Sequence, residues 1–307
     1  MKVAVIGAGY MGRLHAEKFA ARDDAKLVAL ADVDRARAEA LAAKLGCEAF
    51  DDWRAALRDA DAAVIAVPTE RHLEVAGGAL DAGKHVLVEK PIATTVVQAE
   101  SLVAKAARKN LVLQIGHVER YNAAFGALAA RMSRPLFIDA ERLSAFKQRG
   151  ADVDVVRDLM IHDLDLALAL AKGKVTEVSA CGFRVLTDDI DIANARIEFA
   201  DGCVASLSAS RVSQAPLRKL RVFQSDLYVS ADLQAGKLRY VKQSGGAIDE
   251  TEESHSGGDA LALQAAAFIA AVTQKKPIEV TGEDGRRALE LALEVARLVR
   301  ERLTRFG

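Results

Sequence analysis

The chain opens with Met1-Lys2-Val3-Ala4-Val5-Ile6-Gly7-Ala8-Gly9-Tyr10-Met11-Gly12, an apolar run that leads directly into a glycine-rich turn. Residues Arg13 to Ala21 then predict a helix, and a second apolar run ends at Asp32, 20 positions beyond Gly12. Strand, G-x-G-x-x-G turn, helix, strand and acid in this order are the fingerprint of a dinucleotide-binding βαβ unit. This stretch therefore predicts that the chain begins with a Rossmann domain.

Each part of the fingerprint has a mechanical reason. Gly7 permits the tight turn, Gly9 lets the backbone approach a pyrophosphate, and Gly12 lets helix and strand pack closely. An acid at the end of the second strand accepts hydrogen bonds from ribose hydroxyls and repels a 2′-phosphate, which favours NAD over NADP. The predicted cofactor-binding residues of this stretch are Gly7, Gly9, Tyr10, Met11, Gly12 and Asp32.

Composition limits the classes of function. The 307 residues are enough for two domains, and 42 basic against 43 acidic side chains give no electrostatic footprint for nucleic acid or an anionic membrane. The three cysteines, Cys47, Cys181 and Cys203, have no metal-ligand spacing, so we expect reduced thiols and no metal. No stretch is long and apolar enough for a membrane span, and the first apolar run is too short for a signal peptide, so we expect a cytoplasmic protein.

Strand and helix signals alternate up to about residue 116, which predicts an α/β domain with a doubly wound parallel sheet over residues 1–118. We expect strands at Lys2–Gly7, Lys26–Asp32, Ala62–Val67, His85–Glu89 and Val112–Gly116. The helices between them are expected at Arg13–Ala21, Arg35–Lys44, Trp53–Asp59, Arg71–Ala82 and Thr95–Lys109.

The pattern changes in residues 119–307, which we expect to form one C-terminal, substrate-binding α+β domain with a large, mainly antiparallel open sheet. The predicted strands are Leu136–Ser144, Val175–Leu186, Ile192–Phe199, Val204–Val212, Lys219–Gln224, Leu227–Ala231 and Leu238–Gln243. The predicted helices are Asn122–Met132, Val155–Ala171, Asp259–Thr273 and Asp284–Leu303.

Chemistry is expected where parallel strands end, because ligands bind outside the carboxyl ends of strands in such sheets. Val67-Pro68-Thr69 with His72, Glu89-Lys90-Pro91, and Gly116 to Asn122 lie at three such ends. A lysine at the position of Lys90 could stabilise a developing alkoxide or carbonyl oxygen. It could equally be a solvated surface residue, and position alone leaves both readings open.

A second group lies on the helix predicted for Val155–Ala171. Asp158 and His162 are spaced i and i+4, so they are expected to share a helix face, with Asp165 beside them. Histidine can take a proton from a hydroxyl near neutral pH, and a neighbouring carboxylate can fix its tautomer. The alternative is an ordinary exposed face with charge pairing.

Taken together, these motifs resemble the Gfo/Idh/MocA oxidoreductases. The resemblance is carried by Gly7 to Gly12, by Val67-Pro68-Thr69 with His72, by Gly83-Lys84-His85-Val86-Leu87-Val88-Glu89-Lys90-Pro91, and by Asp158-Leu159-Met160-Ile161-His162. It implies a homodimer or homotetramer formed through one face of the C-terminal sheet. It also implies cofactor contacts from Val67, Pro68, Thr69, His72, Glu89 and Lys90.

The resemblance further implies a mechanism for oxidising a sugar hydroxyl. His162 takes the hydroxyl proton, Lys90 holds the oxygen, and Asp158 orients the oxygen or the base, while the division of proton transfer between Lys90 and His162 stays open. A non-catalytic NAD(H)-binding sensor remains an alternative, although such a protein has no need of all three residues. A reductase is another alternative, since hydride transfer is reversible.

Two segments are similar to one branch of the family, the UDP-N-acetylglucosamine 3-dehydrogenases, whose 3-keto product passes to an aminotransferase on the way to lipid A. The first is Gly116-His117-Val118-Glu119-Arg120-Tyr121-Asn122, and the second consists of Phe146-Lys147 together with the stretch from Asp152 to Asp163. Ala123 departs from that pattern, where proline is more usual. The substrate-binding residues implied are Arg120, Asn122, Lys147, Asp158 and His162. A UDP-linked uronic acid, an aldose or an inositol remain open as substrates.

Overall fold

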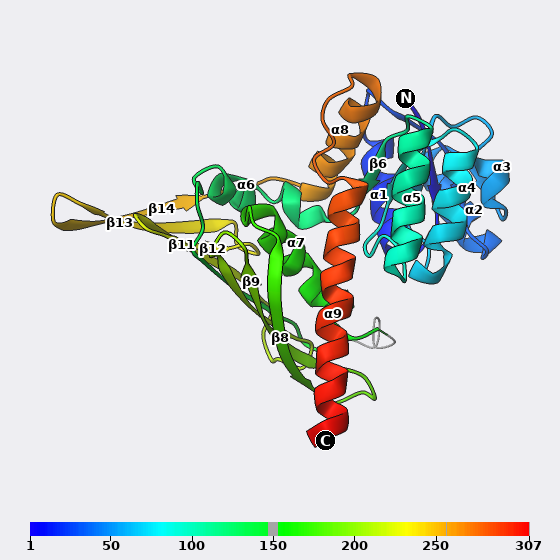
Figure 1. Cartoon of the computed structure of the whole chain (residues 1–307). Coiled ribbons are helices and arrows are strands. Elements are labelled where there is room, and N and C mark those ends of the chain that lie inside the picture. The colour runs from blue at the N-terminus through cyan, green and yellow to red at the C-terminus, as the bar shows by residue number, and fades with distance from the viewer. Residues whose placement is uncertain (147–152, 256, 307) are drawn as a thin grey trace. The chain divides into compact units, whose positions relative to one another are not determined.

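The computed structural model describes residues 1–146, 153–255 and 257–306, so the predicted substrate residue Lys147 lies outside the described residues. The chain divides into two compact units (Figure 1). The first comprises Met1–Val118 and Asp259–Arg286, and the second comprises Glu119–Gly258 and Arg287–Gly307. The first boundary between the units lies between residues 118 and 119.

The first unit is built on a six-stranded parallel sheet with the strand order β3-β2-β1-β4-β5-β6. This doubly wound order agrees with the predicted Rossmann domain. Four of the strands are almost entirely buried, because helices cover the sheet. The strands are β1 (Lys2–Ile6), β2 (Lys26–Ala31), β3 (Glu48–Phe50), β4 (Ala62–Ile65), β5 (His85–Val88) and β6 (Leu113–Ile115).

Side-chain caps and a glycine set several helix ends of this unit. Asp34 accepts a hydrogen bond from the Arg37 amide and Thr95 from the Gln98 amide, while Gly46 ends a helix in the left-handed region at φ 70°. The helical elements are α1 (Tyr10–Ala20), α2 (Arg35–Leu45), α3 (Trp53–Ala56), η1 (Thr69–Arg71), α4 (His72–Asp81), α5 (Val96–Arg108) and α8 (Ala260–Thr273).

Helix α8 corrects the predicted domain division, because residues 259–286 return to the first unit. Phe268 of α8 is fully buried and meets Phe19 of α1 edge to face, with ring centroids 6.4 Å apart. Lys18 also pairs with Asp259 at 2.6 Å. The prediction of one uninterrupted C-terminal domain is therefore wrong, since an apolar helix late in the chain completes the core of the first unit.

The second unit contains an eight-stranded sheet with the order β14-β13-β12-β11-β7-β10-β9-β8. Among the strands that the structure describes in this sheet, β7 and β10 are the only parallel neighbours, which agrees with the predicted mainly antiparallel sheet. Strand β14 was not predicted. The strands are β7 (Phe137–Leu143), β8 (Val175–Phe183), β9 (Ile192–Phe199), β10 (Val204–Ser210), β11 (Leu217–Gln224), β12 (Leu227–Asp232), β13 (Lys237–Ser244) and β14 (Ala247–Ser254).

One face of this sheet carries the core of the second unit. Strand β7 shows the alternation, with Ile138, Ala140 and Arg142 buried and their neighbours partly exposed. Figure 1 shows α7 and the later part of α9 along one face, and no helix of the described residues on the other. The helical elements are η2 (Val118–Tyr121), α6 (Ala123–Ala129), η3 (Val156–Met160), α7 (Ile161–Leu170) and α9 (Gly282–Phe306).

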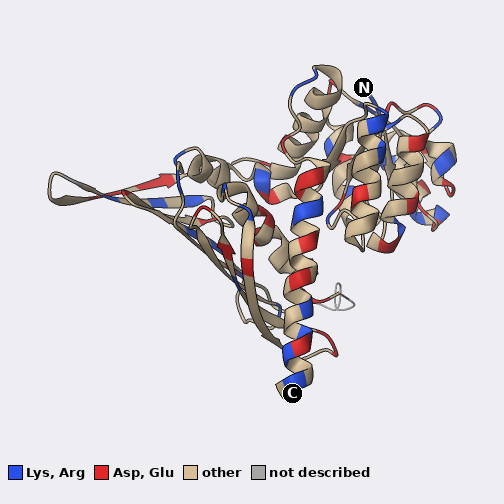
Figure 2. Ribbon diagram, in the orientation of Figure 1, with Lys and Arg blue, Asp and Glu red and all other residues tan. Residues whose placement is uncertain are grey.

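Charges of both signs are interspersed along α9 and over the helices of the first unit (Figure 2). The three cysteines are free thiols. Within the described residues, none of the helices has the length and apolar character needed to cross a membrane.

Candidate functional site

The glycine-rich turn follows β1 and leads into α1. Gly7 has φ +97°, and a Cβ there would come within 2.4 Å of the Ala66 carbonyl oxygen. A Cβ at Gly12 would come within 1.7 Å of the Gly7 oxygen, so only glycine fits at either position. The space around Gly9, in contrast, is open. Apart from its chain neighbours, no described atom lies within 4 Å of where its Cβ would be.

This open space leaves the start of α1 accessible to a ligand. No side chain among the described residues caps the helix at Gly9. The first amides of a helix lack partners within the helix and favour a bound anion. The turn therefore fits the pyrophosphate of a dinucleotide, with Gly9 at the point of closest approach.

Asp32 lies directly after β2 and faces this turn. Its Oδ2 accepts a hydrogen bond from the Ala8 amide at 2.7 Å, and its Oδ1 accepts one from the Asp34 amide at 2.9 Å. An ionised carboxylate has about four acceptor positions, so two of them suffice for these amides and two can serve ribose hydroxyls. Arg37 Nη1 lies 3.6 Å from Asp32 Oδ2.

The segment after β4 is held by a buried histidine. His72 is 1% exposed, with Nδ1 2.9 Å from the Pro91 oxygen and Nε2 3.0 Å from the Val67 oxygen. Burial lowers the pKa of His72, although the two carbonyls act in the opposite direction. Both ring nitrogens face the backbone, so His72 ties the segment of Val67, Pro68 and Thr69 to Pro91. Direct contact of His72 with the cofactor stays a prediction.

Glu89 and Lys90 follow β5, and the Lys90–Pro91 peptide bond is cis. Glu89 is buried, and its Oε1 lies 2.6 Å from Nε2 of the buried His15 on α1. Burial alone would raise the pKa of Glu89, but the hydrogen bond and charge of His15, together with Lys90, hold it below its ordinary value. Lys90 itself is partly buried.

His15 was not among the residues predicted from the sequence. It belongs to the stripe Gly12, His15, Ala16 and Phe19, whose members are buried at helical spacing on α1. A polar side chain inside an otherwise apolar stripe is the signal that could have identified it.

The candidates of the first unit thus gather at one edge of its sheet. The glycine turn follows β1, Asp32 follows β2, Val67 to Thr69 follow β4, and Glu89 and Lys90 follow β5. All these strands are parallel, so their carboxyl ends share that edge.

In the second unit, Asp158 and His162 do not lie on one regular α-helix. Asp158 lies in the five-residue π-helical turn η3, and α7 begins only at Ile161. The wider π turn breaks the 3.6-residue spacing on which the i,i+4 prediction depends. Both side chains are nevertheless partly exposed, whereas Val156, Met160 and Ile161 between and before them are fully buried. Such π turns are frequent at functional sites.

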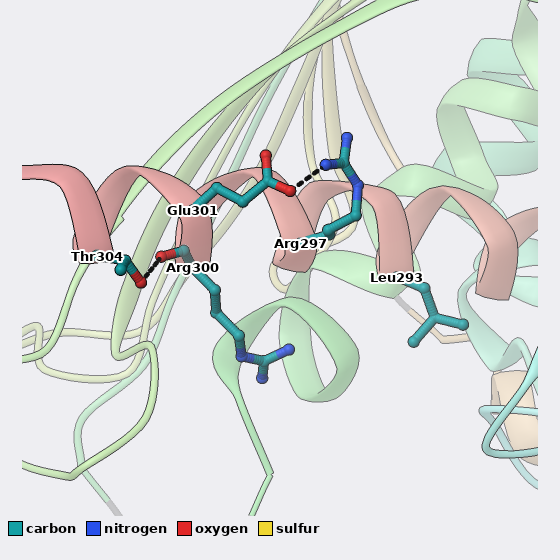
Figure 3. A pocket seen from close by; sticks show the side chains of 5 residues that line it. All are labelled: Leu293, Arg297, Arg300, Glu301 and Thr304. Carbon is teal, nitrogen blue, oxygen red and sulfur yellow. Dashed lines mark hydrogen bonds and ion pairs between the residues drawn. The ribbon is translucent and has the colours of Figure 1, made fainter.

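The π turn is anchored at its start by Asp154, which is fully buried. Its Oδ1 accepts from the Arg157 amide at 2.8 Å, and its Oδ2 accepts from Arg157 Nε at 2.7 Å and Arg300 Nη2 at 2.8 Å. Its carbonyl oxygen accepts from the Asp158 amide at 3.0 Å. Arg300 also lines a hollow on α9, shown in Figure 3 with Leu293, Arg297, Glu301 and Thr304.

Asp165, which the sequence predicts to lie beside Asp158 and His162, turns into the interior of the second unit. Asp165 is 1% exposed, and its Oδ2 accepts a hydrogen bond from Arg120 Nε at 3.0 Å. The pair connects α7 to η2. The Nε of Arg120, a predicted substrate-binding residue, therefore forms a contact inside the second unit.

Asn122 serves as the N-cap of α6. Its Oδ1 accepts from the Ala124 and Phe125 amides, and its Nδ2 donates to the Leu233 oxygen at 2.8 Å and to Glu119 Oε2 at 3.4 Å. These four bonds use the whole capacity of the amide, so we assign Asn122 a positioning role. Ala123 is the first residue of α6, where proline is favoured but not required.

A buried ion cluster connects η2, β7 and α7. Arg142 forms a two-pronged pair with Asp163, at 2.9 Å from Nε and 2.8 Å from Nη2, and donates from Nη1 to Glu119 at 2.8 Å. Arg218, which is half exposed, joins Glu119 at 3.2 Å. Burial would raise the pKa of Glu119, but the charges of Arg142 and Arg218 hold it below its ordinary value. Arg142 was not among the residues predicted from the sequence.

Comparison with known proteins agrees with this geometry. Residues 1–117 match an oxidoreductase family profile, Gfo/Idh/MocA, described as an NAD-binding Rossmann fold, and residues 114–227 match the Gfo/Idh/MocA C-terminal domain. UDP-N-acetylglucosamine 3-dehydrogenase of Acidithiobacillus ferrooxidans is 39% identical over 303 residues, covering 96% of each chain. A myo-inositol 2-dehydrogenase of Thermotoga maritima is 26% identical over 98% of this chain and 97% of that protein.

The fold comparison gives the same relative. A solved structure of UDP-N-acetylglucosamine 3-dehydrogenase from Acidithiobacillus ferrooxidans superposes with a TM-score of 0.94 at 38% identity, covering 98% of each chain. The similarity therefore runs through both units.

Proposed function

The chain belongs to the Gfo/Idh/MocA oxidoreductase family, and on that premise we propose that it oxidises the 3-hydroxyl of UDP-N-acetylglucosamine with NAD. The observation that carries the substrate is the 39% identity over 96% of the chain to a UDP-N-acetylglucosamine 3-dehydrogenase. The TM-score of 0.94 to a structure of that name supports the same assignment.

The residues present fit NAD. The space at Gly9 suits the pyrophosphate, and the carboxylate of Asp32 suits the ribose hydroxyls. Val67, Pro68, Thr69 and Lys90 would line the same edge toward the nicotinamide. When bound, NAD supplies the acceptor for the hydride that leaves the sugar carbon.

The chain's own residues would move the proton. We assign His162 as the group that takes the proton from the sugar hydroxyl, with Asp158 orienting the ring or the oxygen. The ammonium of Lys90 would stabilise the negative charge that develops on that oxygen. Glu119, Arg142 and Asp163 would keep α7 in place, since they fix the residue next to His162.

The remaining parts of the proposal concern partners and setting. Arg120 and Lys147 would contribute to sugar or diphosphate binding. We also propose that the keto product passes to an aminotransferase on a route to 2,3-diamino sugars of lipid A, as the family resemblance implies. We further propose a homodimer or homotetramer in the cytoplasm, where NAD is available.

The test is NADH formation by purified protein with NAD and a panel of substrates. The panel holds UDP-N-acetylglucosamine, its uronic-acid counterpart, glucose and myo-inositol, the last because of the inositol dehydrogenase relative. Each reaction is repeated with an aminotransferase and amino donor, since ketone formation can be uphill. NADH with UDP-N-acetylglucosamine alone, and a 3-keto product by NMR, is the expected result. Turnover of another polyol, with no NADH formed from UDP-N-acetylglucosamine, would overturn the substrate assignment.

A further inference from the structure

A buried polar pair lies beside Lys90 and has no role in the mechanism above. His15 is 1% exposed and Glu89 is 8% exposed, and they meet at 2.6 Å although 74 residues separate them in sequence. A buried carboxylate is costly unless its oxygens are hydrogen-bonded. The pair therefore needs an explanation beyond filling the core.

The carboxylate of Glu89 touches three elements at the carboxyl edge of the sheet. Oε1 meets His15 on α1, the helix that starts at the glycine-rich turn. Oε2 accepts the backbone amide of Lys90 at 3.2 Å. After β6, a Cβ at Gly116 would come within 3.0 Å of Oε1 and of the carboxyl carbon, so glycine leaves this group its space.

The two oxygens thus have different partners, and the carboxylate forms a bridge. One end of the bridge is the helix whose first turn suits the pyrophosphate. The other end is the main chain of Lys90. Because both bonds are charge-assisted hydrogen bonds in a buried place, they restrict the Lys90 backbone more than exposed bonds would.

We propose that His15 and Glu89 are positioning residues, which fix the Lys90 backbone relative to helix α1. The inference rests on the proposed function, in which Lys90 acts on the substrate oxygen. Small displacements of a catalytic group have large effects on rate, since a shift of about 1 Å can cost about 100-fold. Loss of the bridge should therefore lower kcat much more than it weakens binding.

The variants His15→Ala, His15→Gln and Glu89→Gln separate the bridge from general packing. His15→Ala removes the donor to Glu89. His15→Gln keeps an amide N–H that can reach the carboxylate, and so serves as the rescue. Glu89→Gln keeps the shape but removes the charge, and it cannot accept from both His15 and the Lys90 amide in the same way.

His85→Ala is the matched control. His85 lies at the opposite end of the same strand, where its Nδ1 accepts a hydrogen bond from the Val112 amide at 3.0 Å. This variant perturbs β5 far from Lys90 along the strand, so it reports what simple destabilisation of the strand does to activity.

The expected result is a kcat lowered by about 10–100-fold in His15→Ala and Glu89→Gln. In His15→Ala, the KM for the sugar nucleotide and the Kd for NADH should change by less than about threefold, because ground-state binding is not the target. His15→Gln should recover most of the kcat. Equal loss of kcat in His15→Ala and His85→Ala, or no recovery in His15→Gln, would overturn the proposal.

Hydrogen exchange of the Lys90 amide provides a readout that needs no substrate. Exchange should be faster in His15→Ala and Glu89→Gln than in the wild type, and unchanged in His85→Ala. If the wild type oxidises none of the panel sugars, the proposed function fails, while the exchange rates still decide whether the bridge holds Lys90. An unchanged exchange rate of the Lys90 amide in a folded Glu89→Gln protein would show that the Glu89 carboxylate does not hold the Lys90 backbone.

Discussion

Asp32 is the residue on which cofactor choice depends. Its carboxylate accepts the Ala8 amide at 2.7 Å and has Arg37 at 3.6 Å. Asp32→Ser removes the charge that repels a 2′-phosphate and leaves Arg37 to pair with that phosphate. We expect the ratio of kcat/KM for NAD over NADP to fall at least tenfold, or about 1.4 kcal/mol.

The control for this prediction is Asp34→Ser. It removes a second carboxylate close to Arg37, at 3.2 Å, yet keeps a side chain able to cap α2. An equal change of cofactor preference in both variants would show that net charge, and not the position of Asp32, decides the choice.

Lys90 and His162 carry the second prediction at this scale. Lys90→Met and His162→Asn should each lower kcat by about 10²–10⁴-fold, since each removes a group that acts on the reacting oxygen or its proton. NADH binding, followed by fluorescence, should change far less than kcat in either variant. Lys84→Met is the control, because Lys84 precedes β5 at its other end and donates to the Ala60 oxygen at 2.7 Å. Wild-type turnover in His162→Asn would remove the base assignment.

Between elements, the buried cluster of Glu119, Arg142 and Asp163 gives a pH-dependent prediction. The folded pKa of Glu119 lies below its ordinary value of 4.5, despite burial, because of Arg142 and Arg218. A carboxylate of this kind stabilises the fold above its unfolded pKa, and this stabilisation is lost as the pH falls through the folded pKa.

The measurement is urea unfolding of the wild type and Glu119→Gln between about pH 7 and about pH 3. The wild type should be more stable at the upper end, and the difference in free energy of unfolding should shrink as the pH falls. Glu100→Gln, which removes an exposed carboxylate on α5, should leave the wild-type curve unchanged. A Glu119→Gln difference that is constant over the whole range would contradict the assigned cause.

Most elements could be predicted from the sequence because they follow an apolar period. The strand Ile192–Phe199 has the predicted bounds, and the glycine fingerprint located β1, α1 and Asp32. Strand β14 was missed because its sequence, AIDETEES, has no apolar alternation and is almost wholly exposed. It pairs with β13 through a turn at Gly245 and Gly246, both with positive φ.

The parts of the site that the sequence did not predict depend on contacts between distant residues. The inward position of Asp165 follows from Arg120, which is 45 residues away. The π turn at Asp158 was equally hidden, because an apolar pattern does not distinguish i→i+5 from i→i+4 bonding. The buried position of His15 is explained only by its contact with Glu89. Local sequence patterns predict which face of a helix or strand is buried. They do not predict which polar side chains contact each other on that face.

At the scale of the whole molecule, each of the two units is built from two separate stretches of the chain. The first unit is completed only when α8 brings Phe268 to Phe19, so residues 1–118 alone lack part of their core. Helix α9 begins in the first unit and ends in the second. A single helix thereby connects the cofactor-binding unit to the unit that carries Asp158 and His162.

The uncovered face of the second sheet is where we expect copies of the chain to associate, as the family resemblance implies. Phe223 is 36% exposed there and packs between Phe137 and Tyr228, with ring centroids 5.7 and 4.7 Å apart. Contiguous exposed apolar groups of this kind mark interaction surfaces.

Phe223→Glu places a charge in that patch, which would be desolvated without a partner on association. We expect a dimer or tetramer for the wild type by sedimentation at micromolar concentration and a smaller species for Phe223→Glu. NADH binding by the first unit should persist. Val97→Glu, at a 75% exposed position on α5, is the control and should leave the mass unchanged. A monomeric wild type would exclude the assembly, and equal dissociation in both variants would exclude this face.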